Sequence, residues 1–386
     1  MPTKKKAKSS ISTPKVDIIG KESGIYKFTL SDTNLSVANA IRRVILSDIP
    51  VFAMKEFNNN NKMIKIHQNS SQFNNQIIIQ RLGCIPVHID DIGKKVDNLL
   101  IELNMKNESD ELIYVTTEHF KIKQLLDEDK VGGELTEKMV KKIFPPNSYT
   151  KDYILLARLK PKITDDILGE ELHLTAKLSK CTAKESGMFN VVSQCAYGFT
   201  ADPVKQHDAE TAYEERLKAD NIDDNAITFE MENWKNHQSK RYYMENSYDF
   251  KIQSIGIYQS EKIVEMACEI IQSRLNEIKE SIEKGTLKVE TEKIALDKSF
   301  DITLANEDYT IGKVLEYVLH YKYYLENGKL NYVGFLKPHP HETDSIIRLA
   351  FKNEADFTND NMYSILLDAC NISINIFDVI KDNFKN

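Results

Sequence analysis

The side chains best able to do chemistry in this 386-residue chain are paired aspartates, cysteines and two histidines around a proline. Catalysis by two metal ions needs several carboxylates at close spacing, and the pairs at 90–91, 165–166 and 223–224 each stand alone in a turn-like context. His339 and His341 could hold a metal, but no third ligand follows nearby, so a rigid turn is the better interpretation. We therefore predict no catalytic residue and no metal site.

The cysteines and the glycines suggest no further chemistry. No CxxC pair occurs, and neither a phosphate-binding GxxxxGK nor a dinucleotide-binding GxGxxG segment is present. Nucleophilic catalysis by cysteine would need a histidine partner, which the spacing does not suggest. We expect buried free thiols, no cofactor, and no enzyme activity of the isolated chain. The cysteines are Cys84, Cys181, Cys195, Cys268 and Cys370.

Two adjacent arginines lie in the segment SVANAIRRVILSDIP, residues 36–50. Its apolar residues recur at three- and four-residue steps and predict a short amphipathic helix. Its first turn can be capped by a side-chain oxygen of Asp32, Thr33, Asn34 or Ser36, and Pro50 cannot continue the helix. Arg42 and Arg43 lie on the other face, where the pattern alone leaves two interpretations open: a solvated surface or contact with a partner. The apolar positions are Val37, Ala40, Ile41, Val44, Ile45 and Ile49.

A second segment lies downstream, QRLGCIPVHID at residues 80–90, and its RLGCIP part, residues 81–86, is expected to be a strand. Together the two segments resemble the assembly subunit of cellular RNA polymerases: the bacterial alpha amino-terminal domain, the archaeal D subunit and the third subunit of RNA polymerase II. The resemblance implies an α+β dimerisation fold that catalyses no reaction. It also implies a large-subunit interface at Arg42 and Arg43, with Arg81, Leu82 and Gly83 nearby.

The last hundred residues repeat the theme. The words EDYTIG (307–312) and VGFLKPHPH (333–341) resemble the eleventh subunit of RNA polymerase II and the archaeal L subunit, with Tyr309 for the usual histidine and Lys313 for the usual asparagine. Glu307, Asp308 and Thr310 are expected to satisfy amides at a helix start. The chain is therefore expected to fuse both partners into a pseudo-heterodimer.

Two long apolar helices are predicted, one over residues 264–282 and ending near Gly285, and one at the carboxyl end. Periodicity alone equally allows each helix to cover its own sheet, whereas the resemblance favours pairing of the two within the chain. The expected pairing residues are Val264, Ile271, Leu275, Ile278, Ile365, Leu366, Ala369 and Ile376.

These expectations divide the chain into four parts. The fold class is α+β, with two alpha-like dimerisation modules, the first interrupted by a mixed, mainly β insert that ends in a charged, helix-prone stretch. The parts are a basic tail without a core (1–15), a first dimerisation domain (16–60 plus 226–285), the insert (61–225) and a second dimerisation domain (286–386).

The leading hypothesis is an assembly platform that recruits the second-largest, beta-like subunit and the largest subunit, together with small polymerase subunits. DNA and RNA would be contacted only through the complex. Two alternatives stay open. One is a free-standing nucleic-acid-binding protein that uses the basic tail, which the net charge of −7 disfavours. The other is a hydrolase or transferase built from scattered carboxylates.

No apolar run approaches bilayer length and no signal peptide is evident, so we expect an intracellular protein that contacts no membrane. Fused subunits of this kind resemble those of large nucleocytoplasmic DNA viruses. That resemblance implies the host cytoplasm, in a viral factory, with the virion and the nucleus as alternatives.

Overall fold

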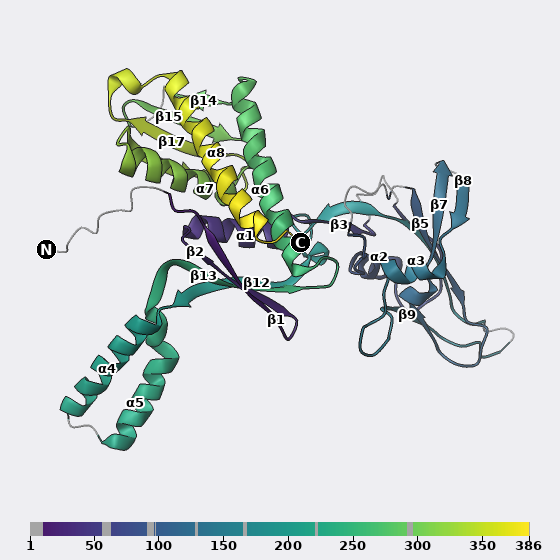
Figure 1. Ribbon diagram of the computed structural model, residues 1–386. Helices are drawn as coiled ribbons and strands as arrows, with labels where there is room; N and C mark the ends of the chain where they lie inside the picture. The colour runs from purple at the N-terminus through teal and green to yellow at the C-terminus, as the bar shows by residue number, and fades with distance from the viewer. Residues whose placement is uncertain are drawn as a thin grey trace. The chain divides into compact units, whose positions relative to one another are not determined.

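The computed structural model describes residues 11–55, 63–90, 96, 98–127, 130–164, 168–220, 223–291 and 296–385. The chain forms two compact units of mixed α and β structure (Figure 1). Unit 1 comprises Met1–Ile45, Gln194–Gln253 and Ser260–Asn386, and unit 2 comprises Leu46–Ser193 and Ser254–Gln259. The predicted basic tail lies outside the described residues as far as residue 10.

The first sheet of unit 1 joins both ends of the predicted first domain, in the strand order β1-β2-β13-β12. β1 and β2 form an antiparallel hairpin, and Gly24 at its turn has a φ of +82°, a conformation that glycine adopts without strain. Tyr26, Phe28 and Leu30 alternate with less buried residues along β2 and are buried. The strands are β1 (Lys15–Glu22), β2 (Ile25–Ser31), β12 (Val192–Ala201) and β13 (Tyr243–Ser254).

Two helices follow strands of this sheet. α1 (Leu35–Ser47) buries its apolar stripe, which confirms the predicted amphipathic helix. Its first turn is capped by Asn34, whose Oδ1 accepts a hydrogen bond from the Ser36 amide at 2.8 Å. α6 (Ser260–Glu283) ends two residues before Gly285, whose φ of +65° confirms the predicted helix end.

Residues 289–351 form another four-stranded sheet, in the order β14-β15-β17-β16. The elements in this part of the chain include the predicted helix start at residues 307–310 and the predicted long helix at the carboxyl end. The strands are β14 (Val289–Glu290), β15 (Ser299–Leu304), β16 (Leu330–Leu336) and β17 (Ser345–Phe351). The helices are α7 (Tyr309–Leu319), the π-helical η4 (His320–Glu326), the short η5 (Glu354–Asp356) and α8 (Asn359–Asp382).

The carboxyl end of the chain packs on the first sheet. The ring of Phe384 lies 5.0 Å from that of Phe28 at an interplanar angle of 72°, and Phe28 stacks on Phe250 at 4.8 Å. All three side chains are buried. The residues just beyond α8 therefore complete the core under β2 and β13.

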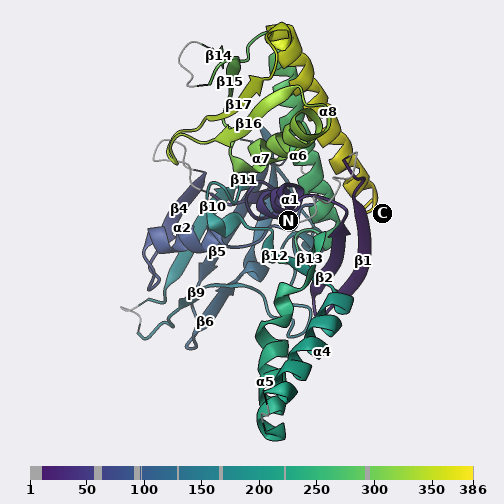
Figure 2. The same ribbon diagram turned by 90° about the vertical axis from the view of Figure 1, so that its left-hand side faces the viewer.

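A helical hairpin connects β12 to β13 and extends away from α6 and α8 (Figure 2). α4 (Pro203–Ala219) confirms the predicted helix-prone stretch, and α5 (Asp224–His237) runs back along it, followed by η3 (Ser239–Arg241). The two helices are held by Trp234, which is buried and whose ring lies 6.3 Å from that of Tyr213.

Unit 2 is mainly β. Its main sheet has the order β4-β10-β5-β7-β8, and two further strand pairs, β11-β3 and β6-β9, accompany it. The strands are β3 (Pro50–Ala53), β4 (Ile64–Asn69), β5 (Leu99–Lys106), β6 (Ile113–Thr116), β7 (Lys121–Asp127), β8 (Lys130–Glu134), β9 (Leu155–Leu159), β10 (Glu171–Lys177) and β11 (Ser179–Thr182). The helical segments are α2 (Asn75–Gly83), α3 (Glu137–Ile143), η1 (Thr117–His119) and η2 (Gly187–Phe189).

The strand predicted for RLGCIP, residues 81–86, is wrong, because residues 81–83 belong to the last turn of α2 and no strand follows there. Asn74 begins this helix by accepting a hydrogen bond from the Ile77 amide at 2.9 Å. Ile78 and Leu82, one turn apart, then bury one face of it. These helix signals begin at Asn74, upstream of the RLGCIP segment on which the strand prediction was based, so that segment alone did not reveal the helix.

The long apolar helix predicted at the carboxyl end is α8. α8 has the length and composition of a membrane span, contrary to the prediction that no run approaches bilayer length. Its apolar side chains, however, pack against α6 and α7. α8 is therefore explained as a core helix of unit 1.

Gly312 allows α7 to approach β16 closely. A Cβ at this position would lie 1.9 Å from Cε2 of Phe335. We predict that Gly312→Ala lowers the stability of unit 1 by about 1–3 kcal/mol through this overpacking, measured by urea unfolding with circular dichroism. Gly198→Ala is the matched control, because nothing lies within 4 Å of its Cβ position. Replacing the ring by a smaller side chain with Phe335→Leu should restore part of the lost stability. A Gly312→Ala variant as stable as the wild type would contradict the prediction.

Candidate functional site

The two adjacent arginines of α1 have different partners. The guanidinium of Arg42 donates from Nε and Nη2 to Oδ1 of Asn39, at 3.1 and 2.9 Å, one turn back on the same helix. Arg43 reaches the start of α7, where Nε donates to Oγ1 of Thr310 at 2.9 Å and Nη2 to Oδ2 of Asp308 at 2.8 Å. Of the two arginines predicted to face the large subunits, Arg42 is thus bonded within α1, and Arg43 is bonded to the start of α7.

A second arginine meets the same helix start. Nε of Arg274, on α6, donates to Oε1 of Glu307 at 3.0 Å, and its Nη2 makes a second bond to the same carboxylate. Only 14% of the Arg274 side chain and 9% of the Glu307 side chain are exposed. Arg274 also lies 4.0 Å from Oδ1 of Asp308. We call Arg43, Arg274, Glu307, Asp308 and Thr310 the Arg–acid cluster.

Local structure fixes the acidic half of this cluster. Asp308 is the N-cap of α7, and its Oδ1 accepts a hydrogen bond from the Thr310 amide at 2.8 Å, as the sequence predicts. The carboxylate of Glu307, which was also expected to satisfy helix amides, accepts hydrogen bonds from Arg274. A carboxylate at a helix N-terminus is favoured by the exposed amides, so Asp308 is held by the helix and by Arg43 together.

The charge of Asp308 is stabilised in the folded chain. Burial by itself would raise the pKa of this carboxyl. Hydrogen bonds from the side chain and backbone of Thr310, and the positive charges of Arg43 and Arg274, outweigh burial and lower the pKa below its usual value. Asp308 is therefore ionised at neutral pH.

The cluster lies beside a pair of long antiparallel helices. α6 packs along α8, and all eight predicted pairing residues are buried (Figure 1). Their role in joining two subunit-like halves stays a prediction. The buried residues are Val264, Ile271, Leu275 and Ile278 on α6, and Ile365, Leu366, Ala369 and Ile376 on α8.

One polar side chain interrupts the apolar face of α6. Gln272, buried within the helix pair, donates from Nε2 to the carbonyl of Ile374 at 3.2 Å and accepts at Oε1 from Nζ of Lys381 at 3.0 Å. A hydrogen bond from Gln272, reinforced by Lys381, also lowers the pKa of Asp378. Such a buried polar contact sets the register of two helices. The sequence analysis did not predict this contact, although a glutamine beside Ile271 in an apolar stripe indicates a buried polar contact.

The other predicted interface residues belong to unit 2. Arg81 donates from Nη2 to the carbonyl of Leu155 at 2.7 Å, and its guanidinium lies 5.2 Å from the centre of the Phe73 ring. Leu82 is fully buried, and a Cβ on Gly83 would lie 2.9 Å from Sδ of Met188. These three residues thus have packing roles within unit 2, whereas Arg42 and Arg43 belong to unit 1.

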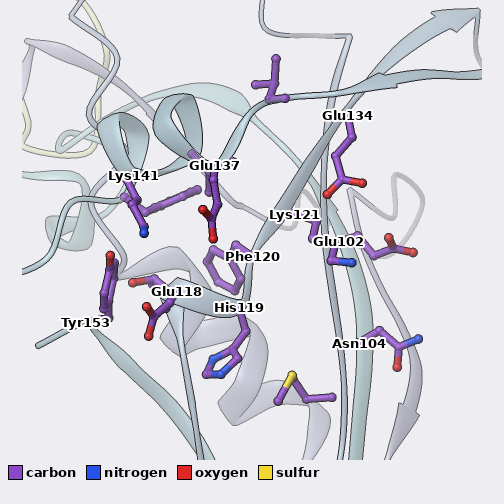
Figure 3. A pocket seen from close by; sticks show the side chains of 15 residues that line it. Glu102, Asn104, Glu118, His119, Phe120, Lys121, Glu134, Glu137, Lys141 and Tyr153 are labelled. Carbon is purple, nitrogen blue, oxygen red and sulfur yellow. The ribbon is translucent and has the colours of Figure 1, made fainter.

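Unit 2 also contains a cavity of about 390 Å³. Figure 3 shows Glu118, Glu137 and Lys141 around the ring of Phe120. Four glutamates, two lysines and a histidine line the cavity, and Glu102 among them pairs with Lys123 outside it. The hydroxyl of Thr117 lies buried at the wall without a hydrogen-bond partner. The mixture of charges selects no single class of ligand.

The described residues contain no group of three or more histidine, cysteine or acidic side chains suited to a metal ion. Burial raises the pKa of the Cys195 and Cys370 thiols to about 12, and burial also raises the pKa of Cys268. These three buried thiols are protonated at neutral pH. The expectation of buried thiols is wrong for Cys84, which is exposed at the end of α2. Residues 339–341 form a turn, in which the amide of His341 donates a hydrogen bond to Nδ1 of His339 at 3.1 Å.

Residues 27–275 match the RNA polymerase Rpb3/Rpb11 dimerisation domain. The chain belongs to this family. The match runs from β2 into α6 and includes α1 with its two arginines. Membership confirms the coarse part of the sequence-based expectation: an α+β chain of the RNA polymerase assembly-subunit type. Residues 286–386 lie beyond the matched segment, so the second dimerisation module rests on other observations.

Individual relatives are distant over most of the family segment. The chain is 21% identical over 305 residues to the human DNA-directed RNA polymerases I and III subunit RPAC1, an alignment that covers 67% of this chain and 82% of that protein. It is 29% identical over 104 residues to subunit Rpo3 of Pyrococcus furiosus, covering 26% of this chain and 37% of the relative. It is 38% identical over 74 residues to subunit 3 of RNA polymerases II, IV and V of Arabidopsis thaliana, covering 19% and 21%.

The buried ion pair of the Arg–acid cluster gives a stability prediction. Arg274→Ala leaves Glu307 buried with its main cation removed, and we expect unit 1 to lose about 3–5 kcal/mol in urea unfolding. Lys262→Ala on the same helix removes an exposed pair with Glu265 and should change stability by less than about 1 kcal/mol. Similar losses in the two variants would show that the cluster does not support the fold.

The lowered pKa of Asp308 gives a pH prediction. The stability that its charge contributes is fully present above the unfolded-state pKa of about 3.9 and is lost as the pH falls through the lower folded-state pKa. Between about pH 5 and pH 2.5, the wild-type chain should therefore lose more stability than Asp308→Asn, which keeps an N-cap but cannot titrate. Parallel losses of the urea midpoint in both proteins would refute this assignment.

Proposed function

We propose that this chain is the assembly platform of a multisubunit DNA-directed RNA polymerase and that both pairing partners are fused in one polypeptide. The observation that carries the proposal is the union of α6, within the family segment, with α7 and α8, beyond it, in one core. The Arg–acid cluster joins the same two parts of the chain. In this role the chain performs no catalysis.

Fusion has a physical consequence for assembly. When two pairing modules share one chain, their association is intramolecular and no longer depends on the concentration of separate subunits. The paired modules then offer one preformed surface to larger partners. The proposed order is therefore pairing first, then binding of the second-largest, beta-like subunit, then addition of the largest subunit and the small subunits.

The proposed large-subunit contact is now centred on Arg42. Arg43 is occupied by Asp308 and Thr310, whereas the bond of Arg42 to Asn39 is local and leaves its half-buried guanidinium at the surface of α1. A planar guanidinium suits bidentate contact with a carboxylate or with carbonyl groups of a partner. Arg81, Leu82 and Gly83 stay part of the proposal as residues that shape unit 2.

The proposal extends to the setting of the polymerase. A fused subunit of the kind found in large nucleocytoplasmic DNA viruses would act in the host cytoplasm, in a viral factory, with the virion and the nucleus as alternative locations. Immunofluorescence of infected cells would separate these locations.

The test of the proposed function is affinity purification of the tagged full chain from its native source at moderate salt, followed by mass spectrometry. Recovery of two very large polymerase subunits in equal amounts is the expected result. Recovery of the chain alone would overturn the proposal. Recovery with nucleic acid only, released by salt, would favour the alternative of a free-standing nucleic-acid-binding protein.

A single substitution tests the Arg42 contact. We expect Arg42→Ala to leave folding unchanged and to weaken binding of the large subunits by about tenfold to a hundredfold, the effect of losing one charge-assisted contact. Arg216→Ala, an exposed arginine on α4, is the matched control. Quantitative pull-down of the two large subunits is the measurement, and equal recovery with Arg42→Ala and the control would remove Arg42 from the interface.

A further inference from the structure

We call the part of unit 1 up to Gly285 its first half and residues 286–386 its second half. The two halves repeat one architecture but carry different charges where they meet. The repeat is visible at the helix starts. Asn34 and Asp308 each accept a hydrogen bond through Oδ1 from the amide two residues later, both at 2.8 Å. The carbonyl of each also accepts from the amide four residues later. Asn34 of α1 is therefore equivalent to Asp308 of α7.

This equivalence aligns the rest of the two helices. Arg42 aligns with Glu316, and each contacts the side chain three residues before it, Asn39 in one case and Lys313 in the other. Arg43 aligns with Tyr317, an uncharged residue. On the acidic side, Glu307 aligns with the buried Thr33.

The long helices repeat as well. Their buried residues coincide when Cys268 of α6 is aligned with Cys370 of α8, and Arg274 then corresponds to Ile376, which is buried. The coinciding pairs are Ile263 with Ile365, Val264 with Leu366, Ala267 with Ala369, Leu275 with Phe377 and Ile278 with Ile380.

The charges are therefore one-sided. The first half supplies two cations, Arg43 and Arg274, and its own helix start carries the neutral Thr33 and Asn34. The second half supplies two carboxylates, Glu307 and Asp308, and has Tyr317 and Ile376 where the first half has its arginines. Only the pairing of a first half with a second half brings opposite charges together.

We propose that Arg43, Arg274, Glu307 and Asp308 are specificity-determining residues that make the first half pair with the second half rather than with a second copy of itself. This inference rests on the proposed function, in which the two halves are pairing partners. Two first halves would place the arginines against Thr33 and Asn34, and two second halves would bury the carboxylates against Tyr317 and Ile376. A buried charge that has lost its partner disfavours a complex strongly, and this is how many interfaces exclude wrong partners.

Shape alone could not give the same selectivity. The aligned apolar residues of α6 and α8 have similar sizes at most positions, so the faces that pair within the chain could also pair with their own copies. Replacing a buried ion pair by neutral side chains often preserves stability. Selectivity and stability can thus be separated by substitution.

The experiment uses the full chain with a protease site inserted between Gly285 and Thr286, so that the two halves are cut apart only after folding. The cleaved protein is incubated, and its complexes are identified by native mass spectrometry, since the halves differ in mass. The neutral variant combines Arg43→Gln, Arg274→Met, Glu307→Gln and Asp308→Asn. The charge-swapped variant combines Arg274→Glu with Glu307→Arg and guards against misfolding of the neutral one.

The wild type and the charge-swapped variant should contain complexes of unlike halves. In the neutral variant the ratio of unlike to like complexes should fall at least about tenfold, equivalent to about 1.4 kcal/mol. A folded neutral variant that contains only unlike halves, or a charge-swapped variant that re-sorts into like complexes, would overturn the inference. Complete separation of the wild-type halves after cleavage would instead count against the proposed pairing itself, so the two failures are distinguishable.

Discussion

The rest of unit 1 depends on mutual burial of α6 and α8. Each helix has 24 residues and a continuous apolar face, and neither face could remain in water without a large loss of hydrophobic free energy. α7 packs against both helices, and Phe384, just beyond α8, fills the core under the first sheet. Segments from both ends of the chain thus form one core, and removing α8 would expose the first half as well as the second.

Polar contacts add direction to this apolar pairing. Hydrophobic burial is nearly indifferent to register, because a helix shifted by one turn buries a similar area. Gln272 restricts α6 and α8 to the register in which it meets Ile374 and Lys381. The Arg–acid cluster restricts the start of α7 in the same way, with Arg43 from α1 and Arg274 from α6. These few hydrogen bonds select one arrangement among several of similar apolar area.

Much of this fold could be predicted from local sequence, because caps and periodicity act over a few residues. α1, the Asp308 cap and the end of α6 near Gly285 are examples. The strand expected at residues 81–86 failed because the decisive signals, the Asn74 cap and the Ile78 to Leu82 step, begin in the preceding segment. The partner of Arg43 could not be predicted, since 265 positions separate it from Asp308 and only the tertiary fold brings them together.

If both pairing modules share one chain, as proposed above, the one-sided charges act during synthesis as well as after it. At about 5–20 residues per second, α8 is completed roughly 5–20 s after α6, because about a hundred residues separate the two helix ends. During this interval the apolar face of α6 has no partner within its own chain, and neighbouring nascent chains present the same face. Pairing of two first halves would bury Arg274 beside that face without Glu307, which disfavours the wrong complex. Once α8 is made, tethering keeps it at a high local concentration near α6 of the same chain. The Arg–acid cluster, whose unpaired arginines disfavoured pairing of two first halves, then stabilises the pairing of α6 with α8.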